Sequence, residues 1–75
     1  MPLHKTLPRF DLQQLVKIPE TVSEKKEARV CGIEWGPDNE KLKVDMEGWV
    51  YYIRFQPNDP AFIVSEKELL SWQGA

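Results

Sequence analysis

The sequence predicts a small, mostly β fold of five short antiparallel strands, followed by a short C-terminal helical turn. Apolar and polar side chains alternate over residues 41–46 and again over residues 49–56, which is the period of a half-buried strand. Clusters of glycine, proline, asparagine and aspartate separate the apolar runs and are typical of turns. A chain of 75 residues is too short for a second hydrophobic core, so we expect one domain.

An N-terminal arm precedes the first strand. Residues 1–13 contain two prolines and few periodic apolar positions, and Phe10 is the residue expected to anchor them. Residues 15–18 form the first strand, which ends at Pro19 because proline has no amide hydrogen for a β-ladder. Residues 14–75 then make up the single domain.

The second strand is expected at residues 28–35, after a polar loop at residues 20–27. Gly32 marks a bulge that exchanges the two faces of this strand, because glycine inside a strand weakens regular pairing. Cys31, Ile33 and Trp35 are assigned to one face and Val30 to the other. Cys31 is interpreted as a small buried apolar residue, with a thiol site as the alternative.

The third and fourth strands are separated by a short turn. Residues 36–39 carry turn residues, and residues 41–46 form the third strand with every second side chain apolar. Glu47 and Gly48 form the next turn, and residues 49–56 form the fourth strand. Its first face carries Trp49, Tyr51, Ile53 and Phe55, and its second face carries Val50, Tyr52 and Arg54. Because the second face is not fully polar, we expect this strand to be central and partly covered on both sides.

The C-terminal part combines a last strand with a capped helical turn. A loop at residues 57–60 leads into the fifth strand at residues 61–64. Ser65 and Glu68 have the spacing of a capping box, in which each side chain bonds the backbone amide of the other residue. The turn places Leu69, Leu70 and Trp72 on one apolar face, which we expect to cover one end of the sheet.

Charge and cysteine content restrict the function classes. Ten basic and twelve acidic side chains give a net charge of −2, which provides no general attraction for nucleic acids or anionic membranes. The single cysteine, Cys31, forms no intramolecular disulfide and favours a reducing compartment. No apolar run is long enough to span a bilayer, and the start of the sequence lacks the apolar core of a secretory signal. We therefore expect a cytoplasmic protein.

No catalytic, cofactor or metal site is predicted. The only histidine, His4, lies in the arm, and one histidine with one cysteine cannot supply the ligands of a metal site. No serine, threonine or cysteine has an activating base nearby in the sequence, and no glycine-rich phosphate loop is present. The turn carboxylates, which are interpreted as solvated or bonded to local amides, are Asp38, Glu40, Asp45 and Glu47. These features favour a non-enzymatic protein.

The predicted elements together resemble a small SH3-like barrel. The matching residues are Gly48, Trp49, Tyr51 and Ile53 in the long strand and Glu66 and Leu69 in the terminal turn. The resemblance covers residues 14–72, is one of fold, and implies a peptide-binding module, a nucleic-acid-binding domain or an accessory subunit. Peptide-binding SH3 domains carry an Ala-Leu-Tyr-Asp-Tyr type stretch near the first strand, and residues 10–15 lack its aromatic pair. The resemblance therefore does not favour recognition of polyproline ligands.

Aromatic and basic residues supply the candidate partner-binding surface. Tyr52 and Arg54 lie on the second face of the predicted central strand, and Trp35 and Trp72 join them if they are not enclosed. Tyrosine, tryptophan and arginine are enriched at binding hot spots. In the alternative interpretation, the tryptophans build the core of this short chain, and Tyr52 and Arg54 are a surface pair.

A second candidate surface is basic. If the second and third predicted strands pair, their basic residues gather into a strip suited to a nucleic-acid backbone. The strip comprises Lys25, Lys26, Arg29, Lys41 and Lys43. Acidic neighbours such as Glu27 and Asp45 weaken it, and a solvated face is the alternative interpretation.

Two functional hypotheses follow. The first is a non-enzymatic protein-interaction module or accessory subunit with an SH3-like barrel fold, which presents aromatic residues beside charged loops to a protein partner. The second is a nucleic-acid-binding barrel that uses the lysine and arginine strip. An exposed edge strand would also allow two copies to pair as a homodimer.

Overall fold

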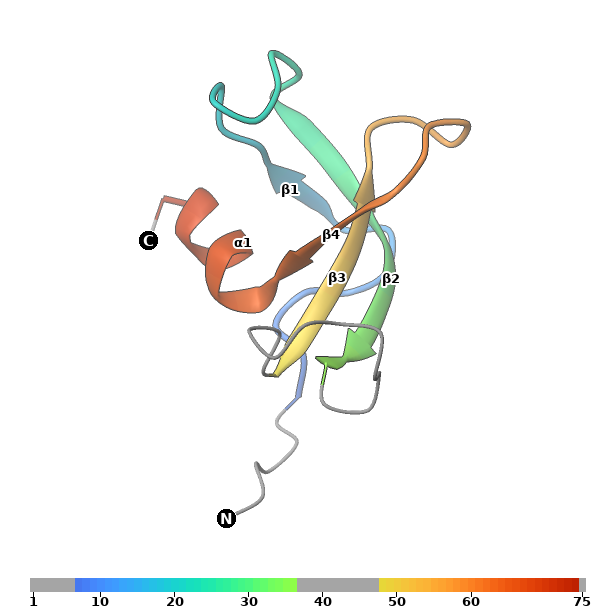
Figure 1. Ribbon diagram of the computed structural model, residues 1–75, viewed down its shortest axis with the longest axis vertical. Coiled ribbons are helices and arrows are strands. Elements are labelled where there is room, and N and C mark those ends of the chain that lie inside the picture. The colour runs from blue at the N-terminus through green and yellow to red at the C-terminus, as the bar shows by residue number, and fades with distance from the viewer. Residues whose placement is uncertain (1–6, 37–47, 75) are drawn as a thin grey trace.

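The computed structural model describes residues 7–36 and 48–74, and about half of these residues lie in four antiparallel strands and one helix (Figure 1). The strands are β1 (Leu15–Lys17), β2 (Glu27–Trp35), β3 (Trp49–Arg54) and β4 (Phe62–Ser65), and α1 (Glu66–Trp72) follows β4 directly. Strands that are consecutive in the sequence are neighbours in the sheet, in the order β1-β2-β3-β4. The mostly β prediction is confirmed, and these strands lie within one or two residues of their expected bounds.

The sheet formed by the described residues is open, with β1 and β4 at its two edges. β3 pairs directly with β2 in a hairpin that extends to a hydrogen bond from the Gly36 amide to the Gly48 carbonyl (2.7 Å). Gly48 has a φ of +94°, which glycine adopts without the steric penalty of a side chain, so this position sets the start of β3. The strand predicted at residues 41–46 lies outside the described residues. The five-stranded barrel therefore stays a prediction.

A β-bulge at Cys31 sets the two faces of the sheet. Val30 pairs with Ile53, and the next pair toward Trp35 and Trp49 is Gly32 with Tyr52, so Cys31 is the inserted residue. The bulge predicted from Gly32 is confirmed. Because an inserted residue interrupts the alternation of faces, Val30 is turned into the core, where it is fully buried. Cys31 is half-buried, whereas the sequence predicts an enclosed position.

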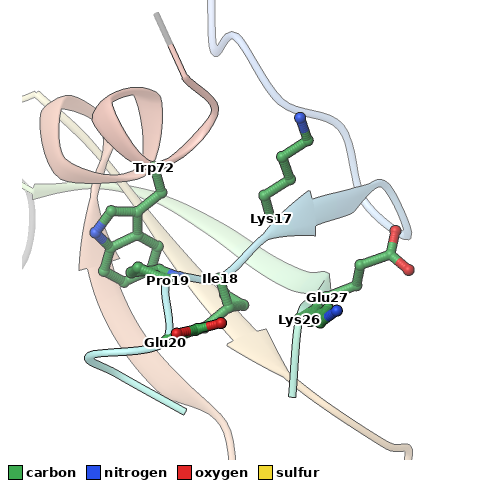
Figure 2. A pocket seen from close by; sticks show the side chains of 7 residues that line it. All are labelled: Lys17, Ile18, Pro19, Glu20, Lys26, Glu27 and Trp72. Carbon is green, nitrogen blue, oxygen red and sulfur yellow. The ribbon is translucent and has the colours of Figure 1, made fainter. Parts of the chain in front are cut away.

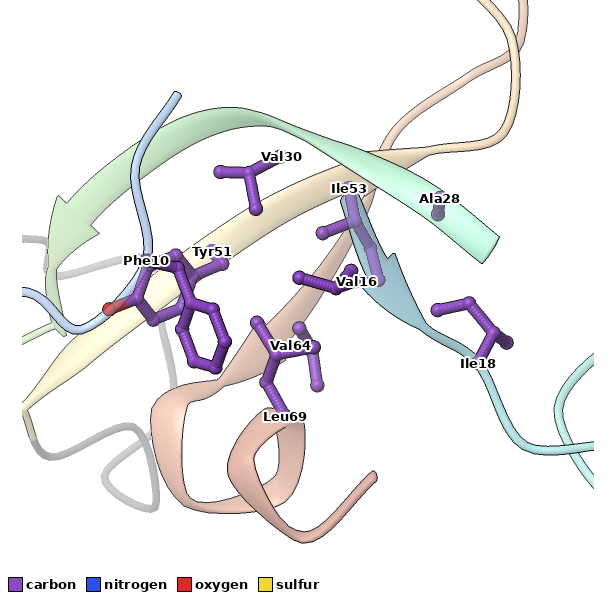
Figure 3. Packing of buried hydrophobic residues seen from close by; sticks show 9 residues of the cluster. All are labelled: Phe10, Val16, Ile18, Ala28, Val30, Tyr51, Ile53, Val64 and Leu69. Carbon is purple, nitrogen blue, oxygen red and sulfur yellow. The ribbon is translucent and has the colours of Figure 1, made fainter. Parts of the chain in front are cut away.

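The core lies on one face of the sheet, between the sheet and α1 (Figure 3). β3 contributes Tyr51 and Ile53, and Val50 on the opposite face of the same strand is also fully buried. The prediction of a central strand partly covered on both sides is therefore confirmed. The core cluster comprises Phe10, Val16, Ile18, Ala28, Val30, Tyr51, Ile53, Val64 and Leu69. Ile33 packs against the same cluster as Val30, which corrects their assignment to opposite faces.

Helix α1 begins at a capped position and covers the core. The Ser65 hydroxyl accepts a hydrogen bond from the Glu68 amide (3.3 Å), which confirms the predicted helix start. Leu69 is fully buried in the core cluster, and Leu70 and Trp72 pack against that cluster while partly exposed. With seven residues, the helix is longer than the single turn that the sequence predicts. No helix in the described ranges is long and apolar enough to cross a membrane.

The end of α1 is tied to the sheet edge at β1. The Gln73 side chain accepts a hydrogen bond from the Lys17 amide (2.9 Å) and donates one to the Lys17 carbonyl (3.2 Å). A further donation to the Leu69 carbonyl (3.0 Å) orients the side-chain amide. A primary amide offers the same kinds of donor and acceptor as a peptide group. Gln73 therefore bonds the edge of β1 as a neighbouring strand would.

The N-terminal arm is anchored by Phe10 and by the phenol of Tyr51. Phe10 is buried, as the sequence predicts, and its ring packs edge-on against that of Tyr51, with centroids 5.2 Å apart. The Tyr51 hydroxyl donates to a Glu66 carboxylate oxygen (2.6 Å). The Arg9 amide donates to the Tyr51 hydroxyl (3.0 Å) and to the same Glu66 oxygen (3.2 Å). One phenol thus joins the arm, β3 and the start of α1.

Replacement of Tyr51 by phenylalanine tests this junction. Burial, followed by the hydrogen bond to Glu66, raises the pKa of the Tyr51 phenol above its ordinary value. The folded protein keeps this proton when the unfolded chain releases it, so the stability contributed by the phenol is complete below about pH 10 and is lost as the pH rises further. We expect Tyr51→Phe to lower the unfolding free energy by about 1–2 kcal/mol at neutral pH and to remove this alkaline decline in urea unfolding experiments.

Tyr52→Phe is the matched control, because Tyr52 lies on the same strand and faces the other way. Its pKa is also raised, chiefly by a hydrogen bond to Glu34, but its phenol is not part of the junction with the arm and α1. We expect this variant to retain the alkaline decline that Tyr51 causes. If Tyr51→Phe and the wild type decline in parallel at alkaline pH, the proposed role of the Tyr51 proton is wrong.

Gln73→Ala tests the bonding of the β1 edge. The change removes hydrogen bonds to Lys17 and Leu69 near the surface, so we expect a loss of about 0.5–1.5 kcal/mol in unfolding free energy. The Lys17 amide hydrogen should also exchange faster, as measured by NMR. Gln14→Ala is the control, since the Gln14 side chain bonds the Asp11 amide instead (2.9 Å). Equal Lys17 exchange in both variants would show that other contacts protect this edge.

Candidate functional site

The sheet face that points away from the core and α1 carries the candidate binding residues, and we call it the outer face. On β3 it carries Tyr52 and Arg54, which alternate with the core residues of that strand. The register places Arg29 of β2 opposite Arg54, and Ile63 of β4 opposite Tyr52. Arg29 and Ile63 are exposed, whereas Tyr52 and Arg54 are half-buried. The outer face thus presents an aromatic ring, an apolar side chain and two guanidinium groups on adjacent strands.

The Tyr52 side chain is held across the β2–β3 hairpin. Its hydroxyl donates to Glu34 Oε2 (2.8 Å). Its ring lies against Gly32, where an added Cβ atom would come within 3.2 Å of Tyr52 Cδ1. The hydrogen bond to Glu34, and to a smaller extent burial, raises the pKa of the Tyr52 phenol. These contacts orient the ring before any partner binds.

A groove of about 190 Å³ lies beside Arg29 and Arg54. Its other described lining residues are Gln13, Cys31, Phe55, Gln56 and Pro57. Arg29 Nη1 donates to the Gln13 carbonyl (2.7 Å). Within residues 7–36 and 48–74, neither arginine forms an ion pair with a carboxylate. The groove is therefore a positively charged recess.

The two candidate tryptophans lie away from the outer face. Trp35 is 9% exposed and packs edge-on against Trp49, with ring centroids 5.1 Å apart. Trp72, at the end of α1, lines a separate open cleft of about 470 Å³ beside Pro19 (Figure 2). Charged side chains of both signs line that cleft, namely Lys17, Glu20, Lys26 and Glu27. Of the four candidate partner-binding residues, the structure brings together only the tyrosine and the arginine.

The described residues of the basic strip do not gather on one surface. Lys25 forms an exposed ion pair with Asp59 (3.7 Å). Lys26 lines the cleft beside α1, whereas Arg29 lies on the outer face. Lys41 and Lys43 lie outside the described residues. The described part of the chain therefore provides no continuous track of cations.

The opposition of Arg29 and Arg54 is the feature that sequence reasoning missed. From the sequence, Arg29 belongs to a basic strip and Arg54 to an aromatic surface, because alternation of faces does not identify cross-strand neighbours. Gly32 was the available sequence signal for the bulge at Cys31. The glycine does not identify β3 as the partner of β2, because the sequence predicts an intervening strand at residues 41–46, so the opposition of the two arginines is known only from the structure.

The described residues include no group of three or more His, Cys, Asp or Glu side chains that could hold a metal ion. His4 and the turn carboxylates Asp38, Glu40, Asp45 and Glu47 lie outside them. No protein-family model, curated protein or solved structure matches the chain. The functional argument therefore rests on the geometry and charge of the outer face.

Glu34→Gln tests whether the carboxylate orients Tyr52. The change removes the charged acceptor that raises the pKa of the Tyr52 phenol, so we expect this pKa to fall toward its ordinary value. The pKa of Tyr51 should stay raised, because its partner is Glu66. An NMR titration of the tyrosine ring signals measures both. Glu24→Gln, at an exposed loop position, is the control. A Tyr52 titration that is the same in all three proteins would contradict the role given to Glu34.

Proposed function

We propose that the chain is a non-enzymatic protein-interaction module or accessory subunit, which binds a protein partner through its outer face. The observation that carries this proposal is the grouping of Tyr52, Arg29 and Arg54 on the sheet face opposite α1. Tyrosine and arginine are enriched among the residues that dominate binding energies. Because Glu34 and Gly32 already orient Tyr52, little side-chain freedom is lost when a partner packs on its ring.

We also propose that the domain is an SH3-like barrel. This is supported by the antiparallel order β1-β2-β3-β4, by the bulged β2–β3 hairpin, and by the capped helix that follows the last strand. The alternating residues 41–46 would supply the fifth strand. Barrels of this kind serve as interaction modules and accessory subunits. The free thiol of Cys31 agrees with a cytoplasmic location.

Nucleic-acid binding is the competing function. It requires several uncompensated cations along one track. In the described chain, however, Lys25 is paired with Asp59 and Lys26 lines a different cleft. The outer face also carries the Glu34 carboxylate beside Tyr52. These charges favour a protein partner over a polyanion.

Tyr52→Ala and Arg54→Ala test the proposed binding face. A tagged wild-type chain would first be used to copurify a defined protein from the host, and the purified pair would then be titrated by calorimetry. We expect each change to weaken the affinity at least about tenfold, because truncation of a hot-spot residue typically costs about 2 kcal/mol or more. Lys67→Ala, at an exposed position of α1, should leave the affinity unchanged. Circular dichroism would confirm that the variants are folded.

Three outcomes would contradict this proposal. Equal affinity of the wild type and both outer-face variants would exclude this face as the binding surface. A labelled oligonucleotide that shifts at low salt and is released at moderate salt would favour nucleic-acid binding. Sedimentation that depends on concentration, without another captured protein, would identify a second copy of the chain as the partner, paired through an edge strand.

A further inference from the structure

Two arginines occupy one cross-strand pair on the outer face. Arg29 and Arg54 lie directly opposite each other in the antiparallel register of β2 and β3. Like charges in this position destabilise a sheet, because the side chains project from the same face with Cβ atoms about 5 Å apart. A carboxylate nearby would offset the repulsion, yet neither arginine has one as an ion-pair partner within the described residues. An anion bound between them would supply that compensation.

The groove beside this pair has the size and lining to receive one small anionic group. Its volume is about 190 Å³, and none of its described lining residues is acidic. Gln13 adopts a left-handed backbone conformation (φ 69°), and its carbonyl accepts the hydrogen bond from Arg29 Nη1 (2.7 Å). That bond orients the Arg29 guanidinium and leaves its other N–H donors available. Arg54 contributes a second set of donors.

The surroundings of the pair favour a carboxylate over a phosphate backbone. A guanidinium and a carboxylate are both planar and bond each other at two points. A nucleic-acid strand would instead need a row of cations. Strand β2 also carries Glu27 and Glu34, and Lys25 is engaged by Asp59. The positive charge is therefore local, which suits a single acidic side chain.

We propose that this groove is an anion pocket that binds the side-chain carboxylate of an aspartate or glutamate in a protein partner. The assignment rests on the proposed function and names the chemistry of the partner. The partner is an acidic polypeptide segment with one carboxylate seated between Arg29 and Arg54. A neighbouring apolar side chain of that segment packs on Tyr52 and Ile63, which are opposite each other on the same face.

The single cysteine of the chain provides a direct test of the pocket. Cys31 lines the groove, so its alkylation rate reports the local charge. Iodoacetate and iodoacetamide react by the same step, in which the thiolate sulfur bonds the methylene carbon and iodide leaves. They differ in bearing a carboxylate or a neutral amide. The ratio of the two rate constants therefore cancels any change in the exposure or the intrinsic reactivity of Cys31.

Arg54→Gln and Arg29→Gln should each lower the ratio of the iodoacetate to the iodoacetamide rate constant. We expect a decrease of about threefold at low salt, the size of one unit charge acting at close range through a partly solvated surface. The decrease should shrink at high salt because mobile ions screen the guanidinium charge. Lys67→Gln makes the same change of charge on α1 and should leave the ratio at the wild-type value. A ratio that is unchanged in both arginine variants would overturn the pocket.

Competition identifies the class of ligand. A short capped oligoglutamate peptide should slow the reaction of wild-type Cys31 with iodoacetamide, and this protection should disappear in Arg54→Gln. If a thymidine oligonucleotide protects Cys31 and the peptide does not, the carboxylate assignment is wrong. The two proposals fail separately. If a protein partner is captured but the rate ratio is the same in the arginine variants, the anion pocket is wrong and the interaction module stands. If the ratio depends on the arginines but no protein partner is captured, the groove attracts anions and the interaction module is wrong.

Discussion

The hydrogen bond between Tyr51 and Glu66 is the contact on which the arrangement of the other elements depends. It joins β3 to the first residue of α1 over 2.6 Å, and the Arg9 amide connects the arm to the same two groups. A helix of seven residues is too short to be stable alone. Tyr51 is fully buried, and a buried hydroxyl without a partner is unfavourable, so burial of the ring and bonding of the phenol reinforce each other. The junction holds α1 on the core face, away from the face that carries Tyr52 and Arg54.

The bulge at Cys31 then determines which residues that face carries. If the register at the hairpin end of β2 and β3 continued without an inserted residue, Val30 would lie opposite Arg54 on the outer face. The insertion instead turns Val30 into the core and brings Arg29 opposite Arg54. A single residue therefore determines both a core contact and the charge of the candidate site, which links the proposed binding surface to the packing beneath it.

The elements that the sequence predicts correctly are those with local causes. Alternation gives the strands, an internal glycine gives the bulge, and a serine gives the helix cap. The hydrogen bonds between the Gln73 side chain and the Lys17 backbone join residues 56 positions apart, and no local sequence pattern predicts them. The candidate site divides in the same way. Tyr52 and Arg54 can be assigned to one face from alternation, but Arg29 can be recognised as their neighbour only when the cross-strand register is known.

Arg29 and Arg54 form a like-charged cross-strand pair, which is unfavourable in a β-sheet. The buried polar side chains, in contrast, have their hydrogen bonds satisfied. In the described chain, no buried side-chain nitrogen or oxygen lacks a hydrogen-bond partner. The repulsion between Arg29 and Arg54 is therefore unlike the satisfied polar contacts of the interior. Both side chains are on the surface of the sheet, where a ligand can offset their charge. Sequences tend to depart from local rules at sites used for function. Because both arginines lie outside the core cluster, their replacement tests the proposed binding separately from folding, which replacement of the buried Trp35 or Tyr51 would not.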